Sequence, residues 1–95
     1  MSNVGDFQEL TSKIRDFAVA RDWVKFHTPK NLAMAIAGEA GELAAEFQWL
    51  TAEQSRALDT ESLQEVAHEI ADVQLYLVRI ADELNIDILK AVADK

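Results

Sequence analysis

The sequence predicts an all-α fold in a single domain of residues 1–95, and three observations support this. Only one proline and three glycines interrupt the 95 residues. Val, Ile and Thr show no strand-like alternation along the chain. Hydrophobic side chains recur instead at the three- and four-residue spacing of amphipathic helices. We therefore expect amphipathic helices joined by short connections.

The first two helices are expected on either side of a connection at residues 23–31. The first covers residues 6–22. Its apolar stripe consists of Phe7, Leu10, Ile14, Phe17 and Ala18. The connection is indicated by Pro29, which disfavours helix at the residue before it. The second helix covers residues 29–50, with Thr28 as its cap and Pro29 at its first helical position.

The third helix is expected over residues 60–84, after a loop at 51–62 that contains a helical turn at 53–58. Thr60 or Ser62 is its expected cap, and Ser62 is followed three residues later by Glu65 in the pattern of a capping box. The polar and acidic residues of the loop separate this helix from the preceding one.

A fourth helix is expected at the end of the chain. Asn85 ends the third helix, and Asp87 begins a helix that continues to the last residue. The chain stops at Lys95 without a helix stop signal, so we expect that a C-terminal tail has been truncated.

Composition limits the possible functions. The net charge of −8 argues against binding nucleic-acid polymers, which relies on Lys and Arg to neutralise phosphates. The chain has no cysteine, so disulfides and thiolate metal sites are excluded. No apolar stretch approaches the roughly 20 residues that span a bilayer, and no signal peptide is visible. We expect a cytoplasmic protein that does not contact membranes.

Two short acidic motifs, Glu39-x-x-Glu42 and Glu69-x-x-Asp72, stand out within the expected helices. At this spacing two carboxylates lie about one turn apart on one face of a helix. Two such helices side by side would gather four carboxylates, which is costly unless a cation neutralises them. The motifs therefore predict a site for a hard divalent cation, of which Mg²⁺ fits best because it often acts with phosphates.

The position of these acids on their helices supports a site. Acidic residues on a helix usually form a solvated face. In helical projection, however, Glu39 falls within the apolar stripe of the second helix. Glu69 borders the stripe of the third helix, with Asp72 just beyond and Tyr76 between them. This placement argues against a solvated face.

Glycines and tryptophans flank the acids. Gly38 and Gly41 each cost a helix interior about 1 kcal/mol relative to Ala, so we expect them to admit either a second helix or a ligand. Trp23 lies in a connection and Trp49 at a helix end, which are unusual places for core residues. Stacking on a nucleobase, worth about 1–3 kcal/mol per base, suits such positions.

The segments 38–43 (GEAGEL), 47–49 (FQW) and 69–73 (EIADV) resemble the E-x-x-E and E-x-x-D signature of MazG-like all-α nucleoside triphosphate pyrophosphohydrolases. The segments 21–32 and 75–78 are similar to the dCTP pyrophosphatase branch of that family. The resemblance covers about residues 17–95.

The resemblance implies a four-helix subunit assembled into a tetramer as a dimer of dimers. It implies that Glu39, Glu42, Glu69 and Asp72 bind Mg²⁺ and form the catalytic set. The implied reaction cleaves dCTP, or a modified dCTP, between its α and β phosphates, giving a monophosphate and pyrophosphate and cleaning the nucleotide pool.

The expected contacts to substrate come from six residues. They are Trp23, His27, Asn31, Trp49, Tyr76 and Lys95. In the resembled branch the two tryptophans line the base pocket, with His27 and Tyr76 close by. From the sequence alone, His27 is equally consistent with a turn residue bonded to backbone. That branch also continues past the position of Lys95, with residues that reach the phosphates.

Two other readings compete with an NTP pyrophosphohydrolase. A metal-binding bundle of the di-iron type is suggested by Glu65-x-x-His68, but such proteins need two of these elements and no second one is present. A non-enzymatic acidic helical interaction module would explain the amphipathic helices. It leaves the acids within the apolar stripes and the two glycines unexplained.

Overall fold

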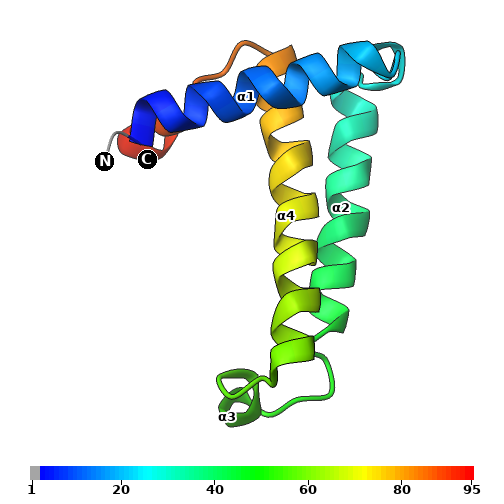
Figure 1. The fold of residues 1–95 in the computed structure, drawn as a ribbon, viewed down its shortest axis with the longest axis vertical. Helices are drawn as coiled ribbons and strands as arrows, with labels where there is room; N and C mark the ends of the chain where they lie inside the picture. The colour runs from blue at the N-terminus through cyan, green and yellow to red at the C-terminus, as the bar shows by residue number, and fades with distance from the viewer. Residues whose placement is uncertain (1–2) are drawn as a thin grey trace.

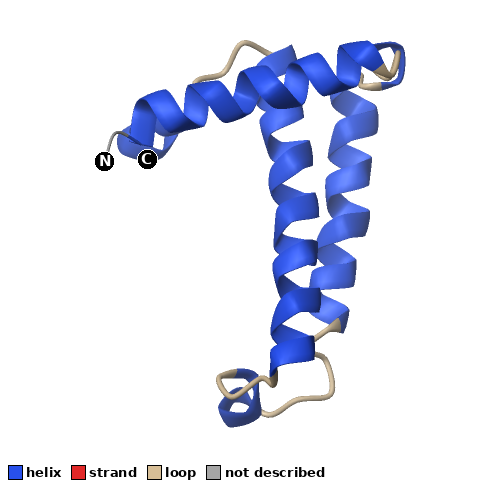
Figure 2. Cartoon of the chain, viewed as in Figure 1, coloured by secondary structure: helices blue, strands red, loops and turns tan. Residues whose placement is uncertain are grey.

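The stretches with helical apolar spacing all form helices, arranged around one long antiparallel pair (Figure 1). The computed structural model describes residues 3–95, in which every regular element is helical (Figure 2). The elements are α1 (Asn3–Ala20), the 3₁₀ helix η1 (Val24–Phe26), α2 (Pro29–Ala45), α3 (Ala52–Ser55), α4 (Thr60–Glu83) and α5 (Ile88–Asp94). Helices α2 and α4 form the pair, and α1 crosses one end of it.

Two expected boundaries are confirmed. The hydroxyl of Thr28 accepts a hydrogen bond from the backbone N–H of Asn31 at 3.2 Å, which caps α2. Asn85 adopts a left-handed conformation with φ 56°, and the N–H of Ile86 donates to the carbonyl of Ala81 at 2.8 Å. This is the Schellman pattern that ends helices, and it terminates α4.

The expected cap of α4 was wrong. Asp59, rather than Thr60 or Ser62, has the extended backbone of a cap, and its carboxylate accepts from the N–H of Ser62 at 2.8 Å. A carboxylate is stabilised at the positive end of a helix. The same hydrogen bond holds the pKa of Asp59 below its usual value. Asp59 is therefore the N-cap of α4, the position that was expected for Thr60 or Ser62.

The first two helices end earlier than expected. Helix α1 begins at Asn3 and ends at Ala20, because Asp22 is left-handed (φ 58°) and turns the chain. Helix α2 ends at Ala45 rather than at residue 50. Beyond it, the N–H of Phe47 bonds to the carbonyl three residues back at 3.0 Å, so the helix tightens into turns.

The hydrophobic core is small and lies where α1 crosses the pair. In the part of the chain whose side chains are described, residues 5–95, four hydrophobic side chains are buried. They are Ala18, Leu32, Val78 and Ala81. Predicted stripe residues such as Leu10 and Phe17 remain more than 40% exposed. No helix among the described residues is long and apolar enough to cross a membrane.

Candidate metal and nucleotide site

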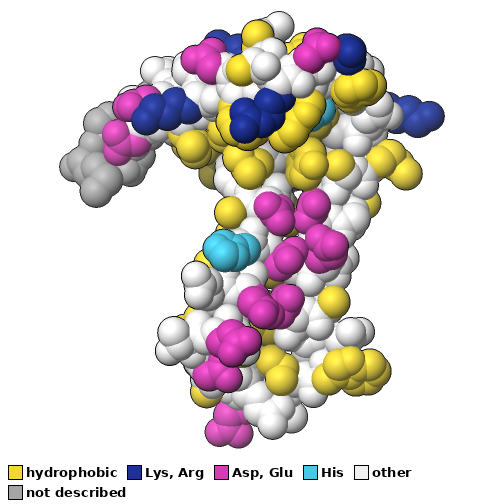
Figure 3. All heavy atoms as spheres, turned by 45° about the vertical axis from the view of Figure 1, so that its right-hand side comes forward, with side chains coloured by type: hydrophobic (Ala, Val, Ile, Leu, Met, Phe, Trp, Pro, Cys, Tyr) yellow, Lys and Arg dark blue, Asp and Glu magenta, His cyan; other side chains and the backbone are white. Residues whose placement is uncertain are grey.

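The four acids of the two motifs face one another across the α2–α4 pair. Helix α2 carries Glu39 and Glu42, and α4 carries Glu69 and Asp72. One carboxylate oxygen from each of Glu39, Glu69 and Asp72 lies within 4.8 Å of the others. Figure 3 shows Asp and Glu side chains gathered down this face, below a band of hydrophobic side chains near α1. The predicted convergence of the two motifs is therefore present.

Two buried carboxylate oxygens of this cluster lack hydrogen-bond partners. Oε2 of Glu39 and Oε2 of Glu69 are buried, and neither has a hydrogen-bond partner among the described residues. A buried, unpaired carboxylate oxygen is costly. All donors in the cluster are carboxylate oxygens, which are the ligands that Mg²⁺ and other hard cations prefer. The residues present therefore fit a divalent metal ion.

The charges of the cluster raise pKa values within it. The pKa of Glu39 is raised, first by a hydrogen bond to Glu42 and then by burial and by neighbouring carboxylates. Burial is the main cause of the raised pKa of Glu69, followed by the charges of Glu42, Asp72 and Glu46. Glu46 is thus a further acid near the site. Its place on the same stripe of α2 is the signal by which sequence reasoning could have included it.

A cavity of about 430 Å³ adjoins the acids. It is lined by Ile14, Phe17, Ala18, Trp23, His27, Glu39, Asp72, Leu75, Tyr76 and Arg79. Ligand sites in proteins commonly have volumes of about 300–1,000 Å³ and mostly apolar walls. Two of the acids are thus part of the wall of a cavity that is otherwise largely apolar and aromatic.

Four of the lining rings contact one another in series. Phe17 and Trp23 are edge to face with centroids 5.4 Å apart, Trp23 and His27 are 6.2 Å apart, and His27 and Tyr76 are 6.4 Å apart. Contacts of this kind hold each ring in a defined orientation. The series forms an aromatic wall that offers a flat ligand several ring faces and edges.

Behind this wall lies a set of charged groups that sequence reasoning missed. We call Arg15, His27, Arg79, Asp82 and Glu83 the Arg79 network. Arg79 is buried, with its side chain only 4% exposed, and it donates from Nε to Nδ1 of His27 at 3.1 Å. Its Nη atoms contact Asp82 Oδ2 at 3.1 Å and Glu83 Oε2 at 2.6 Å. No local pattern in the sequence marks these partners of Arg79.

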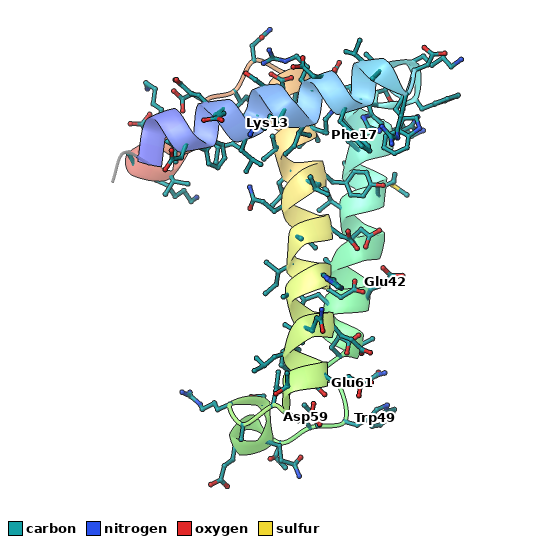
Figure 4. All side chains as sticks on the ribbon, in the orientation of Figure 1. Lys13, Phe17, Glu42, Trp49, Asp59 and Glu61 are labelled. Atoms are coloured by element: carbon teal, nitrogen blue, oxygen red, sulfur yellow. The ribbon has the colours of Figure 1, made fainter. Side chains whose placement is uncertain are left out.

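Three expected substrate residues lie away from the cavity within one subunit. Trp49 is 87% exposed and follows the far end of α2, away from Phe17 (Figure 4). The 17 residues of α2 place that end about 25 Å from its start. The amide of Asn31 donates to the carbonyl of Phe26 at 3.0 Å. Lys95 follows α5, beside the start of α1.

The glycines and the Glu65-x-x-His68 element also have clear places. A Cβ atom built on Gly38 or Gly41 meets nothing within 4 Å among the described residues. No helix among the described residues crosses there, which leaves a ligand or a helix of a second copy to explain the glycines. Glu65 and His68 are exposed, and the metal-competent cluster found in the described part of the chain contains neither. The di-iron reading therefore lacks support.

A larger cavity lies elsewhere. It measures about 560 Å³ and lies between the first half of α1 and the segment that joins α4 to α5. Arg15 and Asp82 belong to its lining, but none of the acids of the two motifs and none of the rings of the aromatic wall does. The smaller cavity is therefore the one that combines possible metal ligands with a stacking surface.

The chain is similar to known pyrophosphatases in both sequence and structure. A crystal structure of a pyrophosphatase from Archaeoglobus fulgidus superimposes with a TM-score of 0.82 and 39% identity, covering 94% of this chain and 83% of that one. The chain matches no family model.

Three mammalian proteins match the chain at a similar sequence identity. The dCTP pyrophosphatase 1 of Rattus norvegicus is 39% identical over 82 residues, and those of Mus musculus and Homo sapiens are 40% identical over the same length. Each match covers 84% of this chain and 48% of the relative. The chain thus spans about half the length of these relatives.

Proposed function

Because the chain belongs to the MazG-like family of all-α pyrophosphatases, we propose that it hydrolyses a nucleoside triphosphate to the monophosphate and pyrophosphate. The substrate class we favour is dCTP or a modified dCTP, since three of its relatives are dCTP pyrophosphatases. Such an enzyme removes unwanted nucleotides from the pool before a polymerase can use them.

A single observation carries the proposal: the metal-competent acids and the aromatic wall share one cavity. Glu39 and Asp72 line it together with Trp23, His27 and Tyr76. A nucleotide has one flat aromatic end and one anionic end, and this cavity would have matching surfaces for both once a cation is bound. An acidic interaction module would need neither the cavity nor the unpaired carboxylates.

Glu39, Glu42, Glu69 and Asp72 are the residues that would hold Mg²⁺. The ion would supply positive charge and Lewis acidity to the phosphoryl oxygens. This is needed because the chain carries a net charge of −8 and the cluster itself would repel a triphosphate. The carboxylates would hold the ion at the edge of the cavity, since Glu39 and Asp72 belong to its lining.

The protein's own groups supply the remaining steps. Oε of Glu39 or of Glu42 accepts the proton of the water that attacks the α-phosphorus, and the pyrophosphate leaves on the opposite side. Trp23 and Tyr76 orient the nucleotide by contact with its base. Because both ends of the substrate are held, the water and the α-phosphorus are already positioned for reaction, which lowers the entropic part of the barrier.

Trp49 joins this site only from a second copy of the chain, because in its own subunit it lies beyond the far end of α2. Exposed apolar side chains on α2 and α4, among them Met34 and Ile70, support such an assembly. We therefore include a dimer of dimers in the proposal. Light scattering at several concentrations tests it, and a monomer at all of them would contradict it.

The activity is tested by incubating the protein with each dNTP and Mg²⁺ and measuring monophosphate and pyrophosphate. We expect dCTP to be cleaved fastest, and EDTA to stop the reaction. Formation of orthophosphate and a diphosphate would show a different cleavage site. Because the chain spans about half the length of its mammalian relatives, a full-length mammalian dCTP pyrophosphatase 1 assayed alongside is the positive control.

A further inference from the structure

The buried Arg79 has no role in the proposed metal chemistry, yet it contacts a residue of the aromatic wall. Its charge is compensated within the Arg79 network by Asp82 and Glu83, and Asp82 is also held by Arg15. The two arginines and two acids have no net charge, so Arg79 is poorly suited to attract a triphosphate. Its third contact, from Nε to His27 Nδ1 at 3.1 Å, joins Arg79 to the histidine of the aromatic wall that lines the same cavity.

This contact fixes the proton of His27. A guanidinium group carries only donors and stays protonated in proteins. Nδ1 of His27 must therefore accept with its lone pair, and the single proton of the neutral ring must lie on Nε2. Burial, followed by the charge of Arg79, lowers the pKa of His27, which agrees with a neutral ring.

The proton on Nε2 remains available to a ligand. No hydrogen-bond partner of Nε2 is found among residues 5–95, whose side chains are described. His27 lines the cavity between Trp23 and Tyr76, and both neighbours contact its ring. A donor inside an aromatic wall recognises a ligand that presents an acceptor at the edge of a flat ring.

We propose that Arg79 is a positioning residue that holds His27 as a neutral N–H donor toward a carbonyl oxygen or ring nitrogen of the nucleobase. This inference rests on the proposed function, which it deepens by naming how the base is read. Cytosine offers O2 and N3 as acceptors, so a pyrimidine satisfies the donor. Arg79 acts through His27 and does not touch the phosphates.

The first test needs no substrate. Long-range ¹H–¹⁵N correlation spectra of the ¹⁵N-labelled protein report which imidazole nitrogen carries the proton. The chain has two histidines, so the signals that disappear in the His68→Gln variant belong to His68 and the remaining ones to His27. We expect His27 to be protonated on Nε2 alone. A proton on Nδ1 in the unaltered protein would overturn the proposal, whatever the enzyme's activity.

The second test is the variant Arg79→Met. The methionine side chain reaches as far as Nε of the arginine but ends there in a methyl group, which donates no hydrogen bond. We expect a mixture of His27 tautomers and a rise of about five- to tenfold in the KM for dCTP, as for the loss of one hydrogen bond. The kcat should change less than about twofold, since the metal site is untouched. An unchanged tautomer, or an unchanged KM after the tautomer changes, would overturn it.

Two controls separate positioning from folding. Arg15→Met removes an ion pair to the same Asp82 but leaves the Arg79–His27 bond, so tautomer and KM should stay as they were. A base-free dideoxyribose triphosphate presents no acceptor, so Arg79→Met should not alter its turnover. If the unaltered protein shows the Nε2 proton but never cleaves dCTP, the proposed function fails while the tautomer assignment stands.

Discussion

Arg15 of α1 reaches across to Asp82 of α4 and holds both of its carboxylate oxygens, Nε to Oδ2 at 2.7 Å and Nη2 to Oδ1 at 2.6 Å. A bidentate arginine–carboxylate contact fixes the relative orientation of the two side chains as well as pairing their charges. The same carboxylate contacts Arg79, so it links the crossing helix to the wall of the candidate site.

Replacing Asp82 by Asn should lower the melting temperature by about 5 °C at pH 7, as for a loss near 1 kcal/mol. Its arginine contacts lower the pKa of Asp82 below the usual 3.8. The stabilisation is therefore complete above that value and is lost as pH falls through the lowered one. Thermal unfolding followed by circular dichroism should show the gap between the two proteins closing below about pH 4.

The matched control for that prediction is Asp94→Asn, which breaks the exposed pair with Lys90. Exposed pairs contribute little, so its melting temperature should change by less than about 2 °C. A D82N protein that loses as much stability on acidification as the unaltered protein would show that Asp82 is not the group concerned.

Replacing Glu69 by Gln should raise stability without metal and remove metal binding. Glu69 has a buried oxygen without a partner and neighbouring acids that raise its pKa. Removing its charge relieves repulsion, so the melting temperature in EDTA should rise. The further rise on adding Mg²⁺, expected for the unaltered protein by mass action, should disappear, and turnover should fall about 100-fold or more.

Glu65→Gln is the control for the metal prediction, because Glu65 is exposed on the same helix and outside the cluster. It should leave the Mg²⁺-induced rise and the turnover unchanged. Equal stabilisation of E69Q and the unaltered protein by Mg²⁺ would place the metal elsewhere.

Trp23 and Trp49 are expected to act on one nucleotide from two copies of the chain. Each single Ala variant should bind dCTP weakly, because each loses a stacking surface worth about 1–3 kcal/mol. After the two variants are unfolded together and refolded, part of the activity should return, since some pockets then combine one intact tryptophan from each. Steady-state assays of the mixture measure this. If no activity returned, the two tryptophans would not act on one nucleotide from different copies.

Replacing Gly41 by Ala should stabilise the subunit and impair the enzyme. The new methyl group meets nothing in its own chain, and Ala is favoured over Gly in a helix interior by about 1 kcal/mol. Because Glu42 is the next residue, we expect the space above Gly41 to be needed by substrate or by a second copy. Denaturant unfolding and turnover measured together test this; unchanged turnover would leave the glycine without a functional reason.

Local signals in the sequence predicted several features well. The Thr28–Pro29 start of α2 and the Asn85 end of α4 depend on a few adjacent residues, and both are confirmed. Helical periodicity predicted that the acids of each motif share one helix face, and the pairing of α2 with α4 brings the two motifs together. The end of α2 was misjudged because apolar residues continue at helical spacing to Leu50, whereas the backbone tightens after Ala45.

The Arg79 network was beyond reach of such reasoning. An arginine on an apolar stripe has no local signature of its role, because its partners come from the same helix and from the connection that carries His27. Likewise, sequence position alone did not show that Trp23 and Trp49 lie at opposite ends of α2. Both features depend on how separate segments meet in space.

The small core has a consequence for the stability of the protein and its resistance to proteolysis in a cell. With only four buried hydrophobic side chains in the described part, a single copy has a small free energy of unfolding. If copies associate through their exposed apolar faces, each association adds to that free energy by mass action. The melting temperature then rises with protein concentration, and newly made, unpaired chains are the form that proteases remove first.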